Sequence, residues 1–467
     1  MAIVGGIMVP HPPLIVPEVG KGGERVIEET ARAYERAADA VKEMKPETIV
    51  LSSPHVVMYG DYLHISPGRA AEGSLSQFGA PSVRSSLSYD TELRDELIRL
   101  IDKKNFPAGT LGERSPALDH GTLVPLYFIM KKYRDFRLLR LGISGISLSE
   151  HYRLGMMIKE AAEKTGRRVV YVASGDLSHK LKEDGPYGFD SCGPAYDKKI
   201  MDVMGRGDFD ELLDFDPVLL DRSAECGHRS FCIMAGAFDR TGVRIEKLSH
   251  QDVTGVGYGI CIYRAEGPDE NRNLLDKWYE RRMGKLEKMK KNEDPYLSLA
   301  RLTIETYIKT GAIIRVPEEV PAEMLNTRAG AFVSLHIDGS LRGCIGTIGP
   351  VADNLAEEII SNAISASTRD PRFSPVRESE LPFLEYNVDV LNPPEKIHSP
   401  DELDVKRYGV IVTKGMKRGL LLPDLDGVDT VSEQLKIAKQ KAGIDPEDNK
   451  VELERFTVTR HSPDGIR

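Results

Sequence analysis

The feature that most constrains the fold is an alternation of apolar runs and helical segments through the first 265 residues. Short apolar runs, such as AIVGGIMV and TIVLSS, are separated by stretches with helical periodicity, such as GGERVIEETARAYERAADAVKEM. Strands that alternate with helices of this length are typical of βαβ units, which make the strands parallel. The pattern predicts an α/β domain with a mainly parallel sheet flanked by helices. Strands are expected at 2–9, 48–53, 136–144, 167–174 and 257–265.

A strongly charged segment divides the chain. Residues 264–293 hold sixteen charged side chains and the only tryptophan, Trp278, within a helical apolar stripe. Such a segment predicts a solvated helical connector. Beyond it, strand-like runs around glycine turns lie beside two or three helices, which predicts an α+β fold. We therefore expect a first domain over 1–265, a connector over 266–294 and a second domain over 295–467.

The composition excludes several classes of protein. Lys and Arg number 63 against 72 Asp and Glu, so the net charge is −9 and the diffuse basic field that drives nucleic-acid binding is absent. No apolar run approaches the ~20 residues that span a bilayer. The five cysteines form no C-x-x-C pair, and the N-terminus has no signal-peptide pattern. We expect a cytoplasmic protein that binds neither nucleic acid nor membranes.

Four histidines of the first domain stand in informative positions. His11, His55 and His179 each come a few residues after an expected strand, and His228 lies in the string AECGHRS. In open α/β sheets, ligands bind beyond the carboxyl ends of the strands. We therefore expect the three imidazoles that follow strands to converge on one pocket.

Neutral imidazoles together with one anionic side chain are a common ligand set for a divalent metal. The candidates for the anion are Glu225, Cys226 and Asp176. Two histidines and one carboxylate leave coordination positions open, an arrangement typical of non-haem Fe(II). The remaining histidine can act as an acid or a base because its ordinary pKa lies near neutral pH.

Five strings, VPHPP, SSPH, LDHGTLVPL, SGDLSH and AECGHRSF, occur in this order. They resemble those of class III extradiol dioxygenases and the related Memo family, over about residues 1–265. The resemblance implies that His11 and His55 are metal ligands and that His179 is the general base. It places His120 behind the ligands or against the substrate. The implied reaction opens the ring of a small aromatic vicinal diol with O2 and Fe(II).

The third metal ligand stays open between two neighbours. The dioxygenases place a glutamate there and Memo-type proteins have a Cys-Gly pair, whereas this chain has Glu225 followed by Cys226. In an extended segment neighbouring side chains point to opposite faces, so only one of the two reaches a metal. The string CGHRSF favours Cys226, and a thiolate would suit zinc or copper. Asp176 is expected either to fix the tautomer of His179 or to bind the metal.

Two other functions fit the same residues. A Memo-like binding module would keep the pocket and a metal but would hold a peptide or a modified substrate without ring cleavage. Metal-assisted hydrolysis would use the same ligands to activate water. Retention of all of His11, His55, His120 and His179 favours an enzyme, whereas Cys226 at the place of a glutamate favours the module.

The second domain has one informative segment. RGCIGT and DPRF, with the strand that follows them, resemble the domain named for the AMME syndrome candidate-region protein, over about 296–465. Arg342 and Cys344 flank a glycine there. Either Cys344 is a nucleophilic or redox thiol whose pKa Arg342 lowers, or it is a buried thiol and Arg342 pairs with an acid. The two resemblances together imply a separate radical-SAM protein as a partner.

Overall fold

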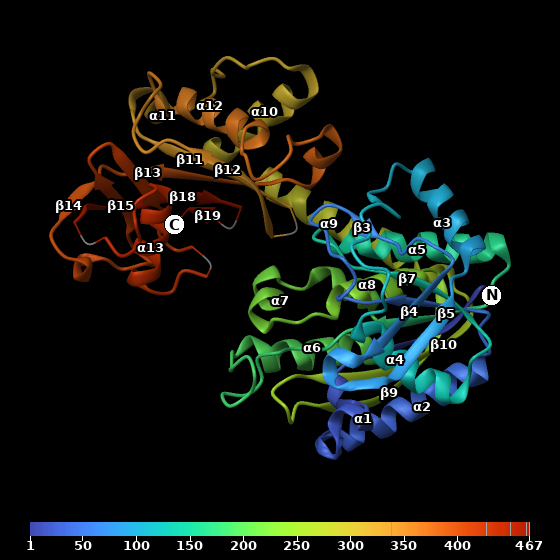
Figure 1. Ribbon diagram of the computed structural model, residues 1–467. Helices are drawn as coiled ribbons and strands as arrows, with labels where there is room; N and C mark the ends of the chain where they lie inside the picture. The colour runs from blue at the N-terminus through green and yellow to red at the C-terminus, as the bar shows by residue number, and fades with distance from the viewer. Residues whose placement is uncertain (338, 426, 449, 464, 467) are drawn as a thin grey trace. The chain divides into compact units, whose positions relative to one another are not determined.

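The structure is a computed structural model, and it describes residues 1–337, 339–425, 427–448, 450–463 and 465–466. The chain forms two compact units, Met1–Tyr279 and Glu280–Arg467. Figure 1 shows helices around a central sheet in the first unit and smaller sheets with helices beside them in the second. The predicted combination of an α/β domain with an α+β domain is confirmed.

The first unit is built on a six-stranded sheet in the order β7-β2-β8-β1-β10-β9. The pairs β7–β2, β2–β8 and β8–β1 are parallel, whereas β10 and β9 extend the sheet in antiparallel fashion. Strands β2 and β8 are buried along their whole length, which explains why they read as continuous apolar runs. The strands are β1 (Ile3–Val9), β2 (Thr48–Ser52), β7 (Arg137–Leu141), β8 (Val169–Ser174), β9 (Thr241–Gln251) and β10 (Tyr258–Pro268).

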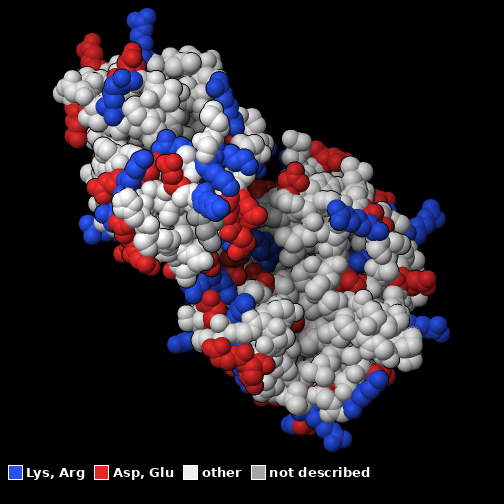
Figure 2. Space-filling model, turned by 60° about the vertical axis from the view of Figure 1, so that its left-hand side comes forward, with Lys and Arg blue, Asp and Glu red and all other residues white. Residues whose placement is uncertain are grey.

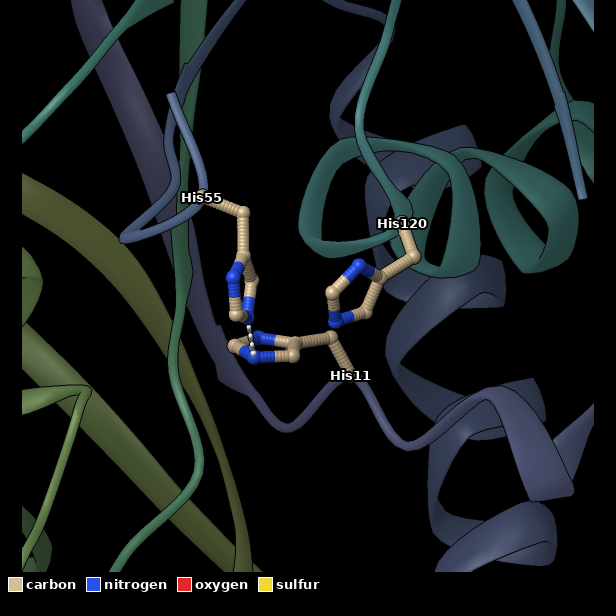
Figure 3. A group of neighbouring side chains, drawn as sticks. All are labelled: His11, His55 and His120. Carbon is tan, nitrogen blue, oxygen red and sulfur yellow. Dashed lines mark hydrogen bonds between the residues drawn. The ribbon is translucent and has the colours of Figure 1, made fainter. Parts of the chain in front are cut away.

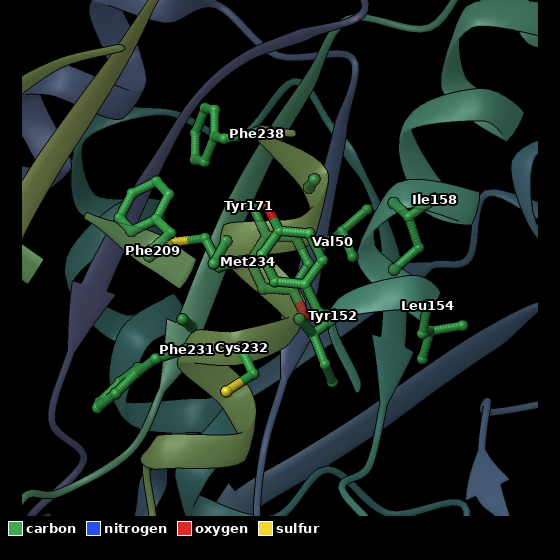
Figure 4. Close-up of a cluster of buried hydrophobic side chains, with 14 of the residues drawn as sticks. Val50, Tyr152, Leu154, Ile158, Tyr171, Phe209, Phe231, Cys232, Met234 and Phe238 are labelled. Carbon is green, nitrogen blue, oxygen red and sulfur yellow. The ribbon is translucent and has the colours of Figure 1, made fainter. Parts of the chain in front are cut away.

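Helices cover both faces of this sheet. One face packs against α2 (Glu28–Met44) and α4 (His120–Lys132). The other face packs against further helices in a core rich in aromatic side chains, which Figure 4 shows around Tyr152 and Tyr171. Ile7 and Met8 belong to opposite cores because successive side chains of a strand alternate. The helices of the second face are α3 (Thr91–Lys103), α5 (Leu148–Thr165), α6 (Cys192–Arg206) and α8 (His228–Ala237).

Short elements complete the first unit outside the main sheet. A hairpin of β4 and β5 and a parallel pair of β3 and β6 lie in the long segment between β2 and α4. The remaining short elements are α1 (Pro17–Gly20), β3 (Leu63–His64), β4 (Ala70–Leu75), β5 (Ala80–Ser88), β6 (Ala108–Gly109) and α7 (Pro217–Ser223).

Helix α9 (Leu274–Lys291) occupies most of the expected connector. Its beginning is not solvated: Leu274, Leu275 and Trp278 are buried in the core of the first unit, and the indole of Trp278 donates to Asp214. The difference from the expected solvated connector has a simple cause, because these apolar side chains gain more from burial than from water. The boundary between the two units falls inside the helix, after Tyr279.

The described residues of the second unit form two antiparallel sheets and four helices that belong to this unit alone. The sheet orders are β12-β11-β13-β18-β19 and β14-β17-β15-β16. The helices are α10 (Pro295–Thr310), α11 (Ala322–Asn326), α12 (Leu355–Thr368) and α13 (Val431–Lys441). The strands are β11 (Ala331–Ile337), β12 (Ser340–Gly346), β13 (Glu385–Leu391), β14 (Glu395–Ile397), β15 (Gly409–Lys414), β16 (Lys417–Leu421), β17 (Glu452–Phe456), β18 (Val458–Ser462) and β19 (Gly465–Ile466).

Two further observations concern the apolar helices and the distribution of charged side chains. In the described part of the chain, no helix combines the length and the apolar character needed to cross a membrane. On the face that Figure 2 shows, acidic and basic side chains are interspersed over both units.

Candidate metal centre

Three histidines meet at the carboxyl edge of the sheet. His11 lies just beyond β1, His55 just beyond β2, and His120 is the first residue of α4. Their ligand nitrogens lie within 4.8 Å of one another, and Figure 3 shows the three rings turned toward a common point. The sheet order brings β1 and β2 to either side of β8. His11 and His55 therefore lie at the carboxyl edge of the sheet, where their positions after strands in the sequence lead us to expect them.

The distances within this group suit a metal ion. Nε2 of His55 lies 3.0 Å from Nε2 of His11, and the ring centroids of His55 and His120 are 3.9 Å apart. Imidazole–zinc bonds are about 2.0–2.1 Å long, so two nitrogens this close can bind one ion together. His11 is buried and His55 is exposed, which leaves the group open to solvent on one side.

The hydrogen bonds of His11 fix which of its nitrogens is free. The hydroxyl of Ser174, at the end of β8, donates its only proton to the carbonyl oxygen of Gly121, 2.6 Å away. Ser174 must therefore accept from Nδ1 of His11, which lies 3.0 Å from the hydroxyl oxygen. Nδ1 thus carries the proton and Nε2 presents its lone pair to the cluster. A ligand imidazole held by its other nitrogen is the usual arrangement in metal sites.

A second group shares the same Nε2 atom of His11. The Sγ atom of Cys226 is 3.8 Å from Nε2 of His11, and a carboxylate oxygen of Asp176 is 4.0 Å from the same nitrogen. Asp176 also accepts from the backbone N–H of His11 at 2.8 Å, and its own N–H donates to the Cys226 sulfur at 3.2 Å. His11 is thus shared by two possible ligand groups, one with His55 and His120 and one with Asp176 and Cys226.

Glu225 does not join either group. Its carboxylate accepts from the backbone N–H of His228 at 2.6 Å, at the beginning of α8, and lies 3.8 Å from Arg229. The side chain is buried there as a cap of the helix, where the helix dipole favours an anion. Of the two neighbours proposed from the sequence, the structure places Cys226 beside His11.

His179 lies beyond the end of β8, with its backbone N–H donating to Ser223. Its ring stacks on that of Tyr187, with centroids 5.0 Å apart. Asp176 and His55 are near enough for their charges to act on the imidazole. His228, which the sequence also singled out, is instead a core residue: its ring is fully buried against Phe215 and its Nε2 lies 2.9 Å from the Leu212 carbonyl oxygen.

Burial keeps the imidazoles of the site neutral. It lowers the pKa of His11 to about 3 and that of His120 to about 3, with the His55 ring as the next cause in each case. Partial desolvation among the neighbouring side chains also lowers the pKa of His55 and of His179. Neutral imidazoles can bind a metal, and a neutral His179 can accept a proton. Burial raises the pKa of Asp176 to about 6 and that of the Cys226 thiol well above its ordinary value.

Sequence reasoning missed two residues that support the histidines. Ser174 fixes the tautomer of His11, and Asp119 accepts from Ser53, which in turn accepts from the backbone N–H of His55. Nothing in the sequence marks Ser174 as a site residue, because a serine at a strand end is common. Asp119 could have been found from the sequence: an Asp that precedes a helical run is a typical N-cap, and the string LDHG places it next to His120.

The predicted residues of the second unit are held by other side chains. Arg342 pairs with Glu380 through two hydrogen bonds of 2.7 and 3.1 Å and donates to Ser374. Cys344 accepts a hydrogen bond from Ser334 at 3.1 Å. Burial raises the pKa of the Cys344 thiol, and the hydroxyl of Ser334 and the charge of Arg372 oppose that rise. Of the two alternatives drawn from the sequence, the pairing of Arg342 with an acid, Glu380, is therefore the one present, and the pKa of the thiol is raised rather than lowered.

Comparison with known proteins also divides the chain into two parts, which correspond to the two compact units. Residues 5–261 match the family described as the catalytic LigB subunit of aromatic ring-opening dioxygenase. The chain belongs to this family. Residues 297–461 match the AMMECR1 family, so the second unit is an AMMECR1 domain. The family is one of metal-dependent oxidoreductases, and the histidine cluster lies within the LigB-matched part.

Individual relatives share one or both parts. A protein of Clostridium acetobutylicum is 40% identical over 99% of both chains. A protein of Thermotoga maritima is 57% identical over 170 residues, which are 36% of this chain and 98% of the relative. A crystal structure described as an uncharacterized protein of Pyrococcus horikoshii is 36% identical, covers 37% of this chain and 93% of its own, and has a TM-score of 0.34.

Proposed function

We propose that the first unit is a metal-dependent dioxygenase that opens the ring of an aromatic vicinal diol with O2. The observation that carries the proposal is the pair of imidazole nitrogens of His11 and His55, 3.0 Å apart at the carboxyl edge of the sheet. The fixed tautomer of His11 supports it, because Nε2 is left unprotonated and points its lone pair at the ring nitrogen of His55. Membership of the ring-opening dioxygenase family supports the reaction class.

The residues around this pair suit an aromatic substrate. His11 and His55 would hold the metal, which would bring the two diol oxygens and O2 together. Phe78 lies edge-on to His120 at 5.2 Å between centroids, and Tyr187 stacks on His179. Aromatic side chains at such positions can pack against a substrate ring. His179, kept neutral by burial, would take the phenolic proton as general base.

The third ligand decides which metal fits best. His120 would complete a set of three imidazoles, which suits zinc, copper, iron or nickel. Cys226 would add a thiolate, which favours zinc or copper over Fe(II). We propose Cys226 as the third ligand, because its sulfur lies beside His11 while the neighbouring Glu225 caps a helix.

The experiment is metal analysis of anaerobically purified full-length protein, followed by oxygen uptake with a panel of catechols. The proposal predicts about one bound transition-metal ion per chain and oxygen consumption that depends on both metal and diol. A His398→Ala variant is the control, because this exposed histidine lies in the second unit. A metal-loaded protein that consumes no oxygen with any diol would contradict the proposed reaction.

One observation favours a second candidate function. The sulfur beside His11 belongs to Cys226, whereas a ring-cleaving Fe(II) site is expected to use a carboxylate there. In this alternative the first unit is a Memo-like module that holds a metal and a peptide or modified substrate, together with a separate radical-SAM protein. Anaerobic co-purification tests it. A metal-loaded chain that is inert to diols but retains such a partner would support the module, and consistent absence of the partner would count against it.

A further inference from the structure

The carboxylate of Asp119 joins the two chain segments that carry His55 and His120. It accepts from the Ser53 hydroxyl at 2.7 Å, from the backbone N–H of Thr122 at 3.0 Å and from the Thr122 hydroxyl at 2.9 Å. The same Ser53 oxygen accepts from the backbone N–H of His55 at 3.2 Å. One carboxylate therefore caps the helix that begins with His120 and reaches the loop of His55 through a single hydroxyl.

A buried arginine completes this junction. Nη2 of Arg140, on β7, donates to Asp119 at 2.9 Å. Arg140 is 3% exposed, and its Nε and Nη1 atoms are buried with no hydrogen-bond partner among the described residues. Since an unpaired buried cation is costly, the pairing with Asp119 holds both groups in place.

The packing around the junction leaves little freedom. A Cβ atom at Gly121 would lie 2.4 Å from the Ser53 hydroxyl, 3.0 Å from the Asp119 carboxylate and 3.1 Å from the His55 ring. Such distances are below van der Waals contact, so only glycine fits between the two segments. The Gly121 carbonyl also receives the hydroxyl of Ser174, the residue that holds His11.

We propose that Asp119 is a positioning residue that fixes the loop of the metal ligand His55 against the helix start of His120, so that metal affinity depends on a side chain that is not itself a ligand. The inference rests on the proposed metal site. Side chains that orient ligands from behind typically contribute 10–100-fold to metal affinity. Asp119 acts on the ligand His55 through a single hydroxyl, so the lower end of that range is expected.

The same sheet contains a matched junction away from the site. Asp90 caps α3 by accepting from the backbone N–H of Leu93, accepts from the hydroxyl of Thr48 and pairs with Arg167 at 3.0 Å. Thr48 begins β2, whereas Ser53 directly follows its end. Asp90 and Asp119 are thus two capping carboxylates, each joined to a hydroxyl and an arginine, at opposite ends of one strand.

The experiment compares the two junctions in the full-length chain. Asp119→Asn and Asp90→Asn are made in parallel, together with the milder pair Ser53→Ala and Thr48→Val, whose members keep the carboxylates. Affinity for Zn²⁺ alone is measured by competition with a chelator. In the metal-free proteins, the ring resonances of His55 and His120 are followed by NMR with ¹³C-labelled histidine.

Asp119→Asn is expected to weaken Zn²⁺ binding about ten-fold and to shift the ring resonances of both histidines. Ser53→Ala should do the same to a smaller degree and mainly at His55. The Asp90 and Thr48 variants should lower the melting temperature but keep the affinity within about two-fold of the wild type.

Two results would overturn this inference and leave the proposed metal site standing. One is an Asp119→Asn variant that folds and binds Zn²⁺ like the wild type. The other is an equal loss of Zn²⁺ affinity in Asp90→Asn. Should Asp119→Asn fail to fold, Ser53→Ala decides the question by the same two measurements. A wild-type chain that binds no Zn²⁺ would overturn the proposed metal site and this inference with it.

Discussion

The histidine cluster of the first unit and the Arg342–Cys344 segment of the second unit both hold chemically active side chains, but in opposite states. At the first, Nε2 of His11 accepts a hydrogen bond from Nε2 of His55 at 3.0 Å, and a metal ion can take the place of that proton. At the second, Arg342 is bound to Glu380 and the Cys344 sulfur receives the Ser334 hydroxyl. Imidazoles that bond to one another through a single proton can exchange it for a metal ion, whereas an arginine paired with a carboxylate holds the fold together.

The comparison also separates two uses of buried charge. Asp370, beside Cys344, accepts from Arg372 at 2.7 and 3.0 Å and from the Cys344 backbone N–H at 2.8 Å. Among the described residues, Asp176, beside His11, has no arginine paired with it in this way, and burial raises its pKa to about 6. A carboxylate left with a raised pKa inside a histidine cluster is typical of functional sites, whereas a fully paired one is typical of scaffolding.

The largest effect is expected from the ligand shared by both possible metal groups. His11→Ala should remove most of the bound metal, because it takes a ligand from a site that has about three. His55→Ala should do so nearly as completely. Elemental analysis of the purified variants checks this, with His398→Ala as the control. Metal content equal to that of the wild type in either variant would contradict the assignment.

The next largest effect concerns His179, the proposed general base. His179→Ala should leave the metal content near normal while lowering turnover by roughly 10²–10⁴-fold, the usual contribution of a positioned proton acceptor. Tyr187→Phe is the matched control, because it keeps the ring that stacks on His179. If His179→Ala instead loses its metal, the imidazole is a ligand and not a base.

A smaller effect should distinguish Glu225 from Cys226, the two neighbouring candidates for the third metal ligand after α7. Cys226→Ser should lower the metal content, because the sulfur lies 3.8 Å from Nε2 of His11. Glu225→Gln should keep the metal and lose only stability, about 1 kcal/mol for a weakened helix cap. Metal analysis and thermal unfolding of both variants test this. Loss of metal in Glu225→Gln alone would reverse the assignment, and two silent variants would point to His120.

The smallest effect is expected in the second unit. The pKa of Asp370 is lowered to about 2, chiefly by its hydrogen bonds with Arg372. A lowered pKa stabilises the fold above the unfolded-state value near 4, and the contribution is lost as the pH falls toward 2. Asp370→Asn should therefore destabilise the second unit by about 1–2 kcal/mol at pH 7 and progressively less below pH 4. Calorimetry that shows the same difference at pH 7 and pH 3 would contradict this origin.

The sequence predicts the sheet and the edge at which His11 and His55 meet, because strand periodicity and the position of a residue after a strand are local properties. It does not predict that His120 joins them, since that histidine begins a helix. The resemblance implies a place for it behind the ligands or against the substrate, whereas the geometry places its nitrogen among possible ligand atoms.

Other features depend on backbone turns that the sequence does not reveal. In an extended segment the side chains of Glu225 and Cys226 would point to opposite faces. Instead the chain turns there, because Ala224 has φ 52° and Gly227 is helical. The turn sends one side chain to the start of α8 and the other toward His11. Similarly, the apolar stripe of the connector is visible in the sequence, but its burial in the first core through Leu274 and Trp278 is not.

Anomalous diffraction at the absorption edge of the bound metal tests the proposed site in one measurement. In crystals of anaerobically purified protein, a single ion is expected between His11 and His55, bonded to the Nε2 atom of each at about 2.0–2.2 Å. The same map shows whether Cys226 or His120 completes the set. An ion bound elsewhere in the chain, or bound without His11, would contradict the proposed metal centre.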